Sequence, residues 1–391
     1  MLNKDGVREL AYVVKIDNIE PIVGSDNCEA AVVGGWKVMV RKETFKAGDL
    51  AVYFEIDSHV DINKPEFAFL CKKHGVIKTQ KYTFGGKNPG FYSQGLLMSG
   101  TDLGLDSLVE GEFLTEKLGV TYADAEDNKR KAKVHPDAKI NAALARHPKI
   151  AKRWGRTIKK YKILRKLFIF FFGKKKDGHG WPAWVTKTDE ERIQNMPWIL
   201  EDKSEWIATE KLDGTSTTFT MKRGKFGKNE FYVCSRNVVF NTPDKACYYD
   251  MNVYLEMAQK YDIENVLNSI LDLDRELDWV TIQGETFGAG IQKRDYGMKD
   301  HDFRAFNFKN SRDGRWNSKK AADYLIQFGV KWVPILDEHF VLPDTVDELL
   351  TIATGKSEID GGMREGIVFR SQDGVQSFKA VSNEFLVKYH Q

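Results

Sequence analysis

The chain has 391 residues, of which 42% are hydrophobic and 12% aromatic, enough for two or three packed domains. No run approaches the roughly 18 apolar residues that span a bilayer, and the N-terminus lacks the apolar stretch of a secretory signal. The four cysteines lie far apart without a CxxC pair, and the eight histidines form no HxxxH pair. We therefore expect reduced thiols, a cytoplasmic location, no membrane contact and no structural zinc.

The net charge is only +3, but the charge is unevenly distributed. Between Lys129 and Lys176 there are 18 lysines and arginines and a single acid, Asp137, which leaves 41 basic and 55 acidic residues elsewhere. Such a basic segment in an acidic remainder indicates a contact with a polyanion. The alternative is a solvated linker whose charge only keeps the chain soluble.

The first 120 residues predict a small β-domain. Short runs rich in Val, Ile, Tyr and Phe are separated by Gly- and Asp-containing turns, which favours a five-stranded barrel of the OB type. The expected strands are Leu10–Ile19, Cys28–Val33, Trp36–Arg41 and Leu50–Ile56.

Residues 121–184 predict a basic, partly helical insert. Ala138–Lys152 is typical of a helix, and Thr157–Phe172 has the apolar and basic alternation of an amphipathic helix. Three glycines and a proline after Phe172 end any regular structure.

Residues 185–391 predict an α+β domain with mostly antiparallel strands. We expect strands at Trp206–Met221 (interrupted at Gly214), Phe231–Val233, Trp279–Gln283, Phe303–Phe308, Gly366–Arg370 and Val375–Ala380. We expect helices at Asp189–Gln194, Tyr248–Leu271, Ser318–Phe328 and Val346–Thr354.

The chemistry centres on Lys211-Leu212-Asp213-Gly214, at the end of a predicted strand. The period of two puts Lys211 and Asp213 on one face, so that amine and carboxylate converge on one ligand. A lysine is a nucleophile once its pKa falls. The pattern alone is weak, because Lys175-Lys176-Asp177-Gly178 matches it too. That copy has no strand around it, and we interpret it as a solvated charge run.

Further elements follow Lys211 in a fixed order. They are Ser235-Arg236-Asn237, Gly284-Glu285 with Gly288, the aromatic strand Phe303–Phe308, Glu365-Gly366-Ile367-Val368 and Phe378-Lys379. Each has a plainer explanation: a strand-end glutamate is usually a surface charge, alternate aromatics usually form core, and a single lysine is usually solvated. The functional interpretation rests on their joint occurrence in one order.

This series resembles the motifs of the covalent nucleotidyltransferases and, within them, the RNA ligase 2-like group. Lys187–Asn195, just upstream of the nucleophile, is also similar to that group. The predicted N-terminal barrel followed by the catalytic domain resembles the Naegleria and Deinococcus type of RNA ligase. The resemblance covers about residues 8–120 and 185–391 and leaves the basic insert unexplained.

The resemblance implies a chemistry. Lys211 would attack the α-phosphorus of ATP and hold AMP, and Lys379 would neutralise the α-phosphate. Asp213, Glu285 and Glu365 would hold Mg²⁺ or Mn²⁺ through water, which suits a cation that keeps most of its waters.

The resemblance also implies how the nucleotide is held. Phe306 would stack on adenine, with Phe303 or Phe308 as the alternatives. Glu210 would contact the adenine edge. Arg236 would contact the ribose or the phosphates, and Glu285 and Glu365 the ribose.

The expected function is an ATP-dependent RNA ligase that joins 3′-hydroxyl and 5′-phosphate ends, with RNA as its partner and no obligate protein partner. Two departures stand out: Ser377 replaces the first lysine of a Lys-x-Lys pattern, and the chain ends twelve residues after Lys379. The short C-terminus argues against the alternatives of a DNA ligase or guanylyltransferase. A non-catalytic RNA-binding protein is the remaining alternative.

Overall fold

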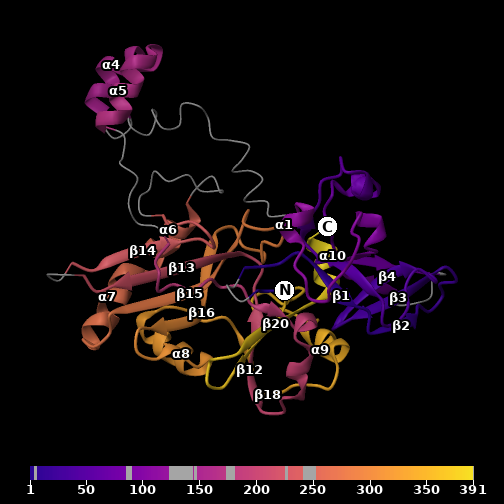
Figure 1. Cartoon of the computed structure of the whole chain (residues 1–391). Coiled ribbons are helices and arrows are strands. Elements are labelled where there is room, and N and C mark those ends of the chain that lie inside the picture. Colours follow the sequence, from indigo (N-terminus) through magenta and orange to yellow (C-terminus); the bar gives the residue numbers. More distant parts are fainter. Residues whose placement is uncertain are drawn as a thin grey trace.

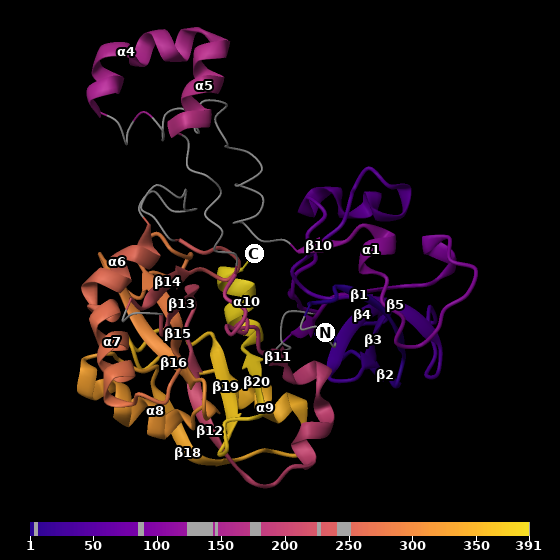
Figure 2. The same cartoon turned by 60° about the vertical axis from the view of Figure 1, so that its left-hand side comes forward.

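The computed structural model describes residues 1–3, 7–84, 90–122, 144, 148–172, 181–224, 228–240 and 252–390. The N-terminal strands form one body and the residues after 181 form a second body beside it, while helices α4 and α5 stand apart from both (Figures 1 and 2). No helix within the described ranges is long and apolar enough to cross a membrane.

The N-terminal body contains two three-stranded antiparallel sheets, β1-β5-β9 and β2-β3-β4. The predictions of Cys28–Val33 and Trp36–Arg41 are confirmed as β3 and β4. The predicted strand Leu10–Ile19 is instead two strands in different sheets. The chain changes sheet at Ile16 and Asp17, whose amides donate to the carbonyl oxygens of Asp49 and Val32, at 2.9 Å each.

The expected barrel is an open one. Strand pairing does not run continuously around it among the described residues, and one link between the sheets is the Gln94 amide, which donates to the Lys37 carbonyl oxygen at 2.9 Å. The strands are β1 Ala11–Lys15, β2 Asn18–Pro21, β3 Cys28–Val33, β4 Trp36–Arg41, β5 Leu50–Phe54, β6 Ser58–His59, β7 Gln80–Tyr82, β8 Phe91–Ser93, β9 Leu96–Met98 and β10 Thr121–Tyr122. The helices are α1 Thr115–Leu118 and the 3-10 segments Pro65–Lys73 and Thr101–Leu103.

Two helices of the insert are described, α4 Pro148–Lys160 and α5 Lys162–Phe172. The predicted helix Thr157–Phe172 was wrong as a single element, because the chain breaks at Tyr161. Most of the predicted helix Ala138–Lys152 lies outside the described residues. Its described end belongs to α4, which begins at Pro148, and proline is well tolerated at the first turn of a helix.

The C-terminal body is built on two five-stranded sheets, in the orders β11-β20-β19-β12-β18 and β14-β13-β15-β16-β17. All of their pairings are antiparallel except that of β11 with β20. The α+β expectation is therefore confirmed. The strands are β11 Glu191–Arg192, β12 Glu205–Lys211, β13 Thr215–Lys222, β14 Glu230–Cys234, β15 Trp279–Gly288, β16 His301–Asn310, β17 Gly314–Arg315, β18 Ile335–Val341, β19 Gly366–Ser371 and β20 Ser377–Val381.

The helices of this body mostly follow the prediction. The predicted helix at 248–271 divides into α6 and α7, because Asp262 lies in the left-handed region (φ 49°), which aspartate tolerates. Residues 248–251 of that prediction lie outside the described residues. Strand β18 and helix α10 were not predicted. The helices are α6 Val253–Lys260, α7 Ile263–Leu273, α8 Ser318–Leu325, α9 Val346–Ala353, α10 Asn383–Tyr389 and the 3-10 segments Ile193–Asn195, Pro197–Glu201 and Ile326–Phe328.

The predicted helix Asp189–Gln194 was wrong. Glu191 and Arg192 instead form β11, which pairs in parallel with Phe378 and Lys379 of β20. Tertiary pairing outweighs local helix propensity here. The segment therefore runs along the sheet that carries Lys379, where its side chains reach the cavity described below.

A buried polar centre joins the two bodies. Asn195 donates through Nδ2 to Glu55 Oε1 at 2.8 Å, and its Oδ1 accepts from Trp36 Nε1 at 2.6 Å. Glu55 is fully buried and also accepts from Tyr12 and from Arg8 Nε, both at 3.1 Å. Because buried polar groups are costly unless partnered, these bonds fix how the two bodies dock.

Candidate active site

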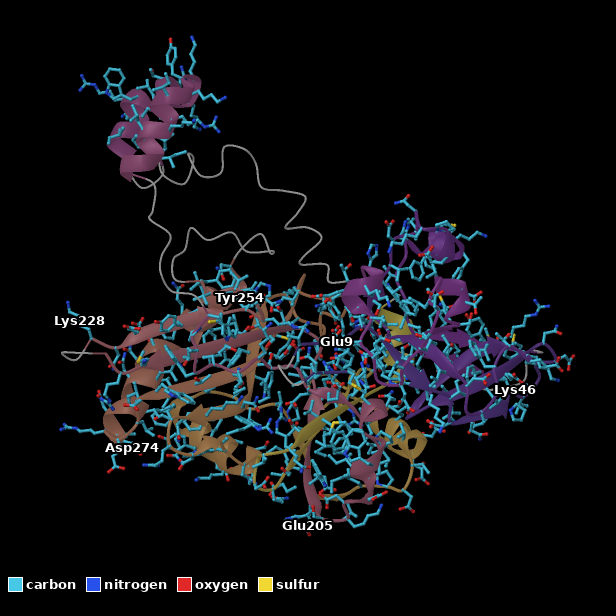
Figure 3. The ribbon with its side chains drawn as sticks, viewed as in Figure 1. Glu9, Lys46, Glu205, Lys228, Tyr254 and Asp274 are labelled. Atoms are coloured by element: carbon cyan, nitrogen blue, oxygen red, sulfur yellow. The ribbon has the colours of Figure 1, made fainter. Side chains whose placement is uncertain are left out.

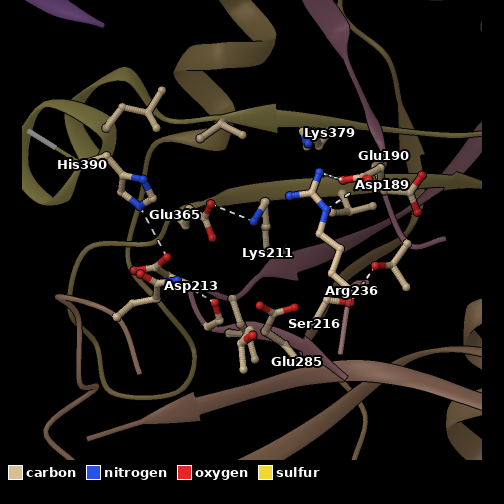
Figure 4. Close-up of a pocket in the computed structure, with 18 of the residues that line it drawn as sticks. Asp189, Glu190, Lys211, Asp213, Ser216, Arg236, Glu285, Glu365, Lys379 and His390 are labelled. Atoms are coloured by element: carbon tan, nitrogen blue, oxygen red, sulfur yellow. Dashed lines mark hydrogen bonds and ion pairs between the residues drawn. The ribbon is translucent and has the colours of Figure 1, made fainter. Parts of the chain in front are cut away.

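A cavity of about 440 Å³ lies where the two bodies meet. The C-terminal body supplies most of its wall through the ends of β12, β19 and β20 and the facing strands β13 and β15 (Figure 4). The N-terminal body adds Arg8, Asp57, Lys78 and Tyr122. Both bodies therefore shape a single site.

Lys211 ends β12 and lies directly beside the first residue of β19, since Lys211 pairs with Gly366. This register brings Glu365 next to it, with Lys211 Nζ 2.7 Å from Glu365 Oε1. Burial by itself lowers the pKa of the Lys211 ammonium. The carboxylates of Glu365, Glu285 and Asp213 outweigh burial and raise that pKa above its ordinary value. Lys211 is therefore an ammonium in the free site.

Asp213 and Glu285 complete a group of three carboxyls around Lys211 (Figure 4). Glu285 lies on β15 opposite Ser216 of β13, and burial raises its pKa to about 8. Asp213 Oδ2 and Glu365 Oε2 are buried without a hydrogen-bond partner. A bound cation would give these unpartnered oxygens a partner. It would also favour the ionised form of Glu285, whose pKa is raised without it.

The residues fit a hydrated cation better than a directly ligated one. Among the described residues, no three His, Cys, Asp or Glu side chains come together closely enough to hold a metal directly. Mg²⁺ retains several waters in most protein sites, and carboxylates can hold those waters. The three carboxyls therefore suit the expected attachment through water.

Lys379 lies on β20, between Arg192 of β11 and Val368 of β19. Burial is the main reason that its pKa falls to about 7, and the nearby cations Arg8, Arg192 and Lys211 lower it further. An amine held in this state gains a full charge when an anion approaches. Lys379 is thus suited to a phosphate group.

Arg236 follows β14 and forms a two-point ion pair with Asp189. Its Nη2 lies 2.7 Å from Asp189 Oδ1, and its Nε donates to Oδ2 at 3.2 Å. The guanidinium also lies 5.2 Å from the centre of the Tyr122 ring. Two neighbours from different bodies therefore hold Arg236 at the cavity.

The aromatic strand β16 sends Phe306 to the cavity. Phe303 and Phe308 are 0% and 1% exposed in the hydrophobic core, so Phe306 is the ring of the three that reaches a ligand. The Arg370 guanidinium lies 5.7 Å from the centre of the Phe306 ring. Glu210, on β12, accepts the Glu358 amide at 2.8 Å through Oε2, while its buried Oε1 has no partner.

Ser377, the departure from the Lys-x-Lys pattern, forms polar contacts of its own. Its hydroxyl donates to Glu190 Oε2 at 2.5 Å and accepts from Arg315 Nη1 at 2.9 Å. Arg370 Nη2 also lies 3.4 Å from Glu190 Oε1. The position therefore belongs to a polar network that includes Glu190 and Arg370 in the cavity wall.

Two groups of cavity residues were not predicted from the sequence. His390, which follows α10, lies with Nε2 3.4 Å from Asp213 Oδ1, and Arg8 and Tyr122 come from the other body. Helix α10 has a detectable signal, because the Ser382 hydroxyl caps it by accepting the Phe385 amide. No sequence pattern links Arg8 or Tyr122 to the cavity. Lys175, the second match to the lysine pattern, lies outside the described residues.

Comparison with known proteins supports this architecture. A sequence model described as RNA ligase matches residues 204–390, and one of an OB-fold domain matches residues 10–98. A search of curated protein sequences found no match.

Solved structures of RNA ligase from Naegleria gruberi resemble nearly the whole chain. The structure with PPi has a TM-score of 0.71 at 26% identity, covering 98% of this chain and 99% of that one. A glutamate-to-alanine mutant with ATP and Mn has a TM-score of 0.72 at 27% identity, covering 98% and 100%. Another such mutant, with AMP and Mn, has a TM-score of 0.71 at 26% identity, covering 98% and 99%. Residues 204–390 therefore form a nucleotidyltransferase domain of the RNA ligase type and residues 10–98 an OB-fold domain, and the chain has the fold of the Naegleria RNA ligase.

Proposed function

We propose that the chain is an ATP-dependent RNA ligase in which Lys211 is the nucleophile. The observation that carries this proposal is the convergence of Lys211, Lys379 and three carboxyls on one cavity of an RNA ligase domain. A non-catalytic RNA-binding protein would have no need for this convergence. The complexes of the Naegleria enzyme with ATP, AMP and Mn support ATP and a divalent cation as ligands of the same cavity.

In the first step Lys211 loses a proton and its Nζ attacks the α-phosphorus of ATP. A P–N bond forms while the bond to the bridging oxygen breaks, and pyrophosphate leaves. The carboxylate of Glu365, 2.7 Å from Nζ, is the group in contact that accepts the proton. Lys379 neutralises the α-phosphate, since phosphoryl transfer depends mainly on positioning and charge neutralisation.

Asp213, Glu285 and Glu365 would hold Mg²⁺ or Mn²⁺ through water. A bound divalent cation would supply further neutralisation of phosphate charge and would satisfy the unpartnered oxygens of Asp213 and Glu365. The ion would also counteract the raised pKa of Lys211, because a second cation nearby disfavours the ammonium form.

The nucleotide is held at the other end of the cavity. Phe306 stacks on adenine, since its ring reaches the cavity while Phe303 and Phe308 are core residues. The unpartnered Oε1 of Glu210 accepts a hydrogen bond from the adenine edge. Arg236 contacts the ribose or phosphates from its ion pair with Asp189.

The remaining steps transfer AMP to RNA and then remove it. An oxygen of an RNA 5′-phosphate attacks the phosphorus of lysyl-AMP, the P–N bond breaks, and Lys211 takes up a proton. A 3′-hydroxyl then attacks the activated 5′-phosphate, the phosphodiester forms, and AMP and the hydroxyl proton are released.

We further propose a division into residues 1–120, an insert at 121–184 and a catalytic domain at 185–391. Separate hydrophobic clusters on either side of the insert support it, for example around Phe54 and around Phe219. A cytoplasmic location and action without an obligate protein partner are also proposals. The free thiols of Cys28 and Cys71, two of the cysteines in the described ranges, agree with a reducing location.

The test is a gel assay with a nicked duplex that carries a 3′-hydroxyl and a labelled 5′-phosphate. We expect ATP- and metal-dependent sealing when the strand with the 3′-hydroxyl is RNA, loss in Lys211→Ala, and retention in Lys175→Ala. Sealing of all-DNA nicks at an equal rate, or no sealing of any RNA-containing nick, would contradict an RNA ligase.

A further inference from the structure

We propose that the basic arm, defined here as α4 and α5 (residues 148–172), is a second RNA-binding surface that grips phosphates away from the cavity. It rests on the proposed function only in taking RNA as the polyanion. Neither of the two matching sequence models covers this segment. Its helices stand apart from both bodies in two views (Figures 1 and 2).

Charge is the first observation. The arm contains nine lysines and arginines and no acidic residue. Five of the cations lie on α4 with exposed side chains at spacings of one, three and four residues, which places them along one face of the helix. They are Lys152, Arg153, Arg156, Lys159 and Lys160. At 1.5 Å per residue this stripe is about 12 Å long, enough to follow roughly three or four phosphates of one strand.

Packing is the second observation. Ile158 of α4 and Phe168 of α5 are buried against Leu144 in a small cluster of their own. Part of the apolar surface of each helix therefore packs inside the arm, while Ile163, Leu164 and Leu167 of α5 stay exposed. The basic side chains extend outward from the helices (Figure 3). A cluster this small stabilises the hairpin without requiring contact with the rest of the chain. The outer face is left for a ligand.

The third observation is that the cations of the α4 stripe have no acidic partner among the described residues. Within the described part of the chain, none of the five cations on the α4 stripe forms a salt bridge. Instead, the Arg153 guanidinium lies 6.0 Å from the Trp154 ring and Lys160 Nζ lies 5.6 Å from the Tyr161 ring. Trp154 and Tyr161 are 53% and 52% exposed. Cations beside exposed aromatic rings are typical of surfaces that hold single-stranded nucleic acid, where bases stack on the rings.

An anionic lipid surface shares this chemistry, and α5 exposes Ile163 at 75%. RNA is favoured because the same chain contains an RNA ligase domain. RNA must in any case reach the cavity of the same molecule. A basic stripe on the arm would raise the local concentration of RNA there.

The test removes charge from the stripe in the full-length protein. The variant combines Arg153→Ala, Arg156→Ala, Lys159→Ala and Lys160→Ala, and the matched control combines Lys228→Ala, Arg275→Ala, Lys299→Ala and Lys356→Ala on exposed positions of the catalytic domain. Binding of a labelled 20-nucleotide RNA is measured by fluorescence anisotropy between 50 and 300 mM salt. Self-adenylylation is measured on the same samples.

We expect the arm variant to bind RNA roughly tenfold to a hundredfold more weakly. The slope of log K against log salt should become less negative by about 0.7 for each RNA phosphate that the variant leaves without a cation. The control should bind with an unchanged slope, and a variant that exchanges Arg for Lys and Lys for Arg at the four arm positions should bind like the wild type. All should self-adenylylate normally, which separates this proposal from the proposed catalytic function.

Two results would overturn the proposal. One is an equal salt slope in the arm variant and the wild type. The other is loss of sedimentation with phosphatidylserine vesicles in the arm variant while RNA binding is retained, which would assign the arm to a membrane surface.

Discussion

Positive charge is concentrated in two regions of this molecule. In one the cations are paired with acidic side chains, and in the other they are not. In the cavity, Lys211 lies 2.7 Å from Glu365, Arg236 lies 2.7 Å from Asp189, and Arg8 lies 3.1 Å from fully buried Glu55. On the basic arm the exposed cations of α4 have no acidic partner within the described residues. Buried charge needs partners to offset desolvation, whereas solvated charge does not.

The difference shows what each region can do. Paired, buried groups hold a fixed geometry, which is what phosphoryl transfer requires. Unpaired, exposed cations hold no geometry but attract any phosphate backbone at long range, in a salt-dependent manner. Substitutions in the cavity should therefore have large effects that resist salt, and substitutions on the arm small effects on stability that depend on salt.

The largest effect is expected from Glu365→Gln. The change removes the anion beside Lys211 and one of the three carboxyls proposed to hold the metal. Loss of such an electrostatic group lowers rates on the order of a hundredfold to a thousandfold. The rate of lysyl-AMP formation in a single turnover measures it. Glu384→Gln, an exposed position on neighbouring α10, is the control, and a rate in Glu365→Gln within threefold of the wild type would refute the role.

Glu55→Gln should destabilise the docking of the two bodies. The change leaves buried Arg8 without its carboxylate, and removal of one partner of a buried pair costs about 3–5 kcal/mol. Urea unfolding gives the free energy. The arm substitution Lys160→Ala should change the free energy of unfolding by less than ~0.5 kcal/mol, because it is exposed. An equal change in the free energy of unfolding for Glu55→Gln and Lys160→Ala would contradict the difference between buried, paired charge and exposed charge.

The lowered pKa of Lys379 predicts that the protein takes up a proton when ATP binds. Its pKa is about 7 in the folded protein against 10.5 ordinarily, so between these values the unfolded chain binds a proton that the folded site lacks. Stability from this group therefore rises with pH across that window. A bound α-phosphate would restore the ammonium at pH 8.5. Calorimetry in buffers of different ionisation enthalpy should give nearly one proton more for the wild type than for Lys379→Arg, and no difference would contradict the role.

Sequence reasoning recovered the site where strand register determined it. Lys211 ends β12 and Glu365 directly precedes β19, while Glu285 and Lys379 lie within β15 and β20. The sequence pattern predicted these strands, and the structure brings all four residues to one cavity. The alternation could not show that Asp189 would pair with Arg236 from an extended segment, because that choice depends on β20.

The sequence also could not predict which residues the N-terminal body supplies to the cavity. Arg8 and Tyr122 depend on how Asn195 docks onto Glu55, which is a contact between residues 140 positions apart. Likewise, the sequence pattern placed one helix where α4 and α5 meet at Tyr161, because both halves of that stretch have the same apolar and basic alternation.

The smallest effect is expected from Tyr122, whose ring lies 5.2 Å from the Arg236 guanidinium and 5.8 Å from that of Arg8. Loss of the ring in Tyr122→Ala removes cation–π interactions worth about 0.5–2 kcal/mol. This corresponds to roughly a twofold to thirtyfold rise in KM for ATP. Tyr122→Phe retains the ring and should retain the KM. A normal KM in Tyr122→Ala would show that Asp189 alone positions Arg236.

The central claim is that Lys211 carries AMP, and covalent labelling tests it most directly. The protein is incubated with ATP labelled at the α-phosphate and Mg²⁺, denatured and separated on a gel. We predict label on the wild type and on Lys175→Ala and none on Lys211→Ala. An unlabelled wild type, or label that survives in Lys211→Ala, would contradict the account.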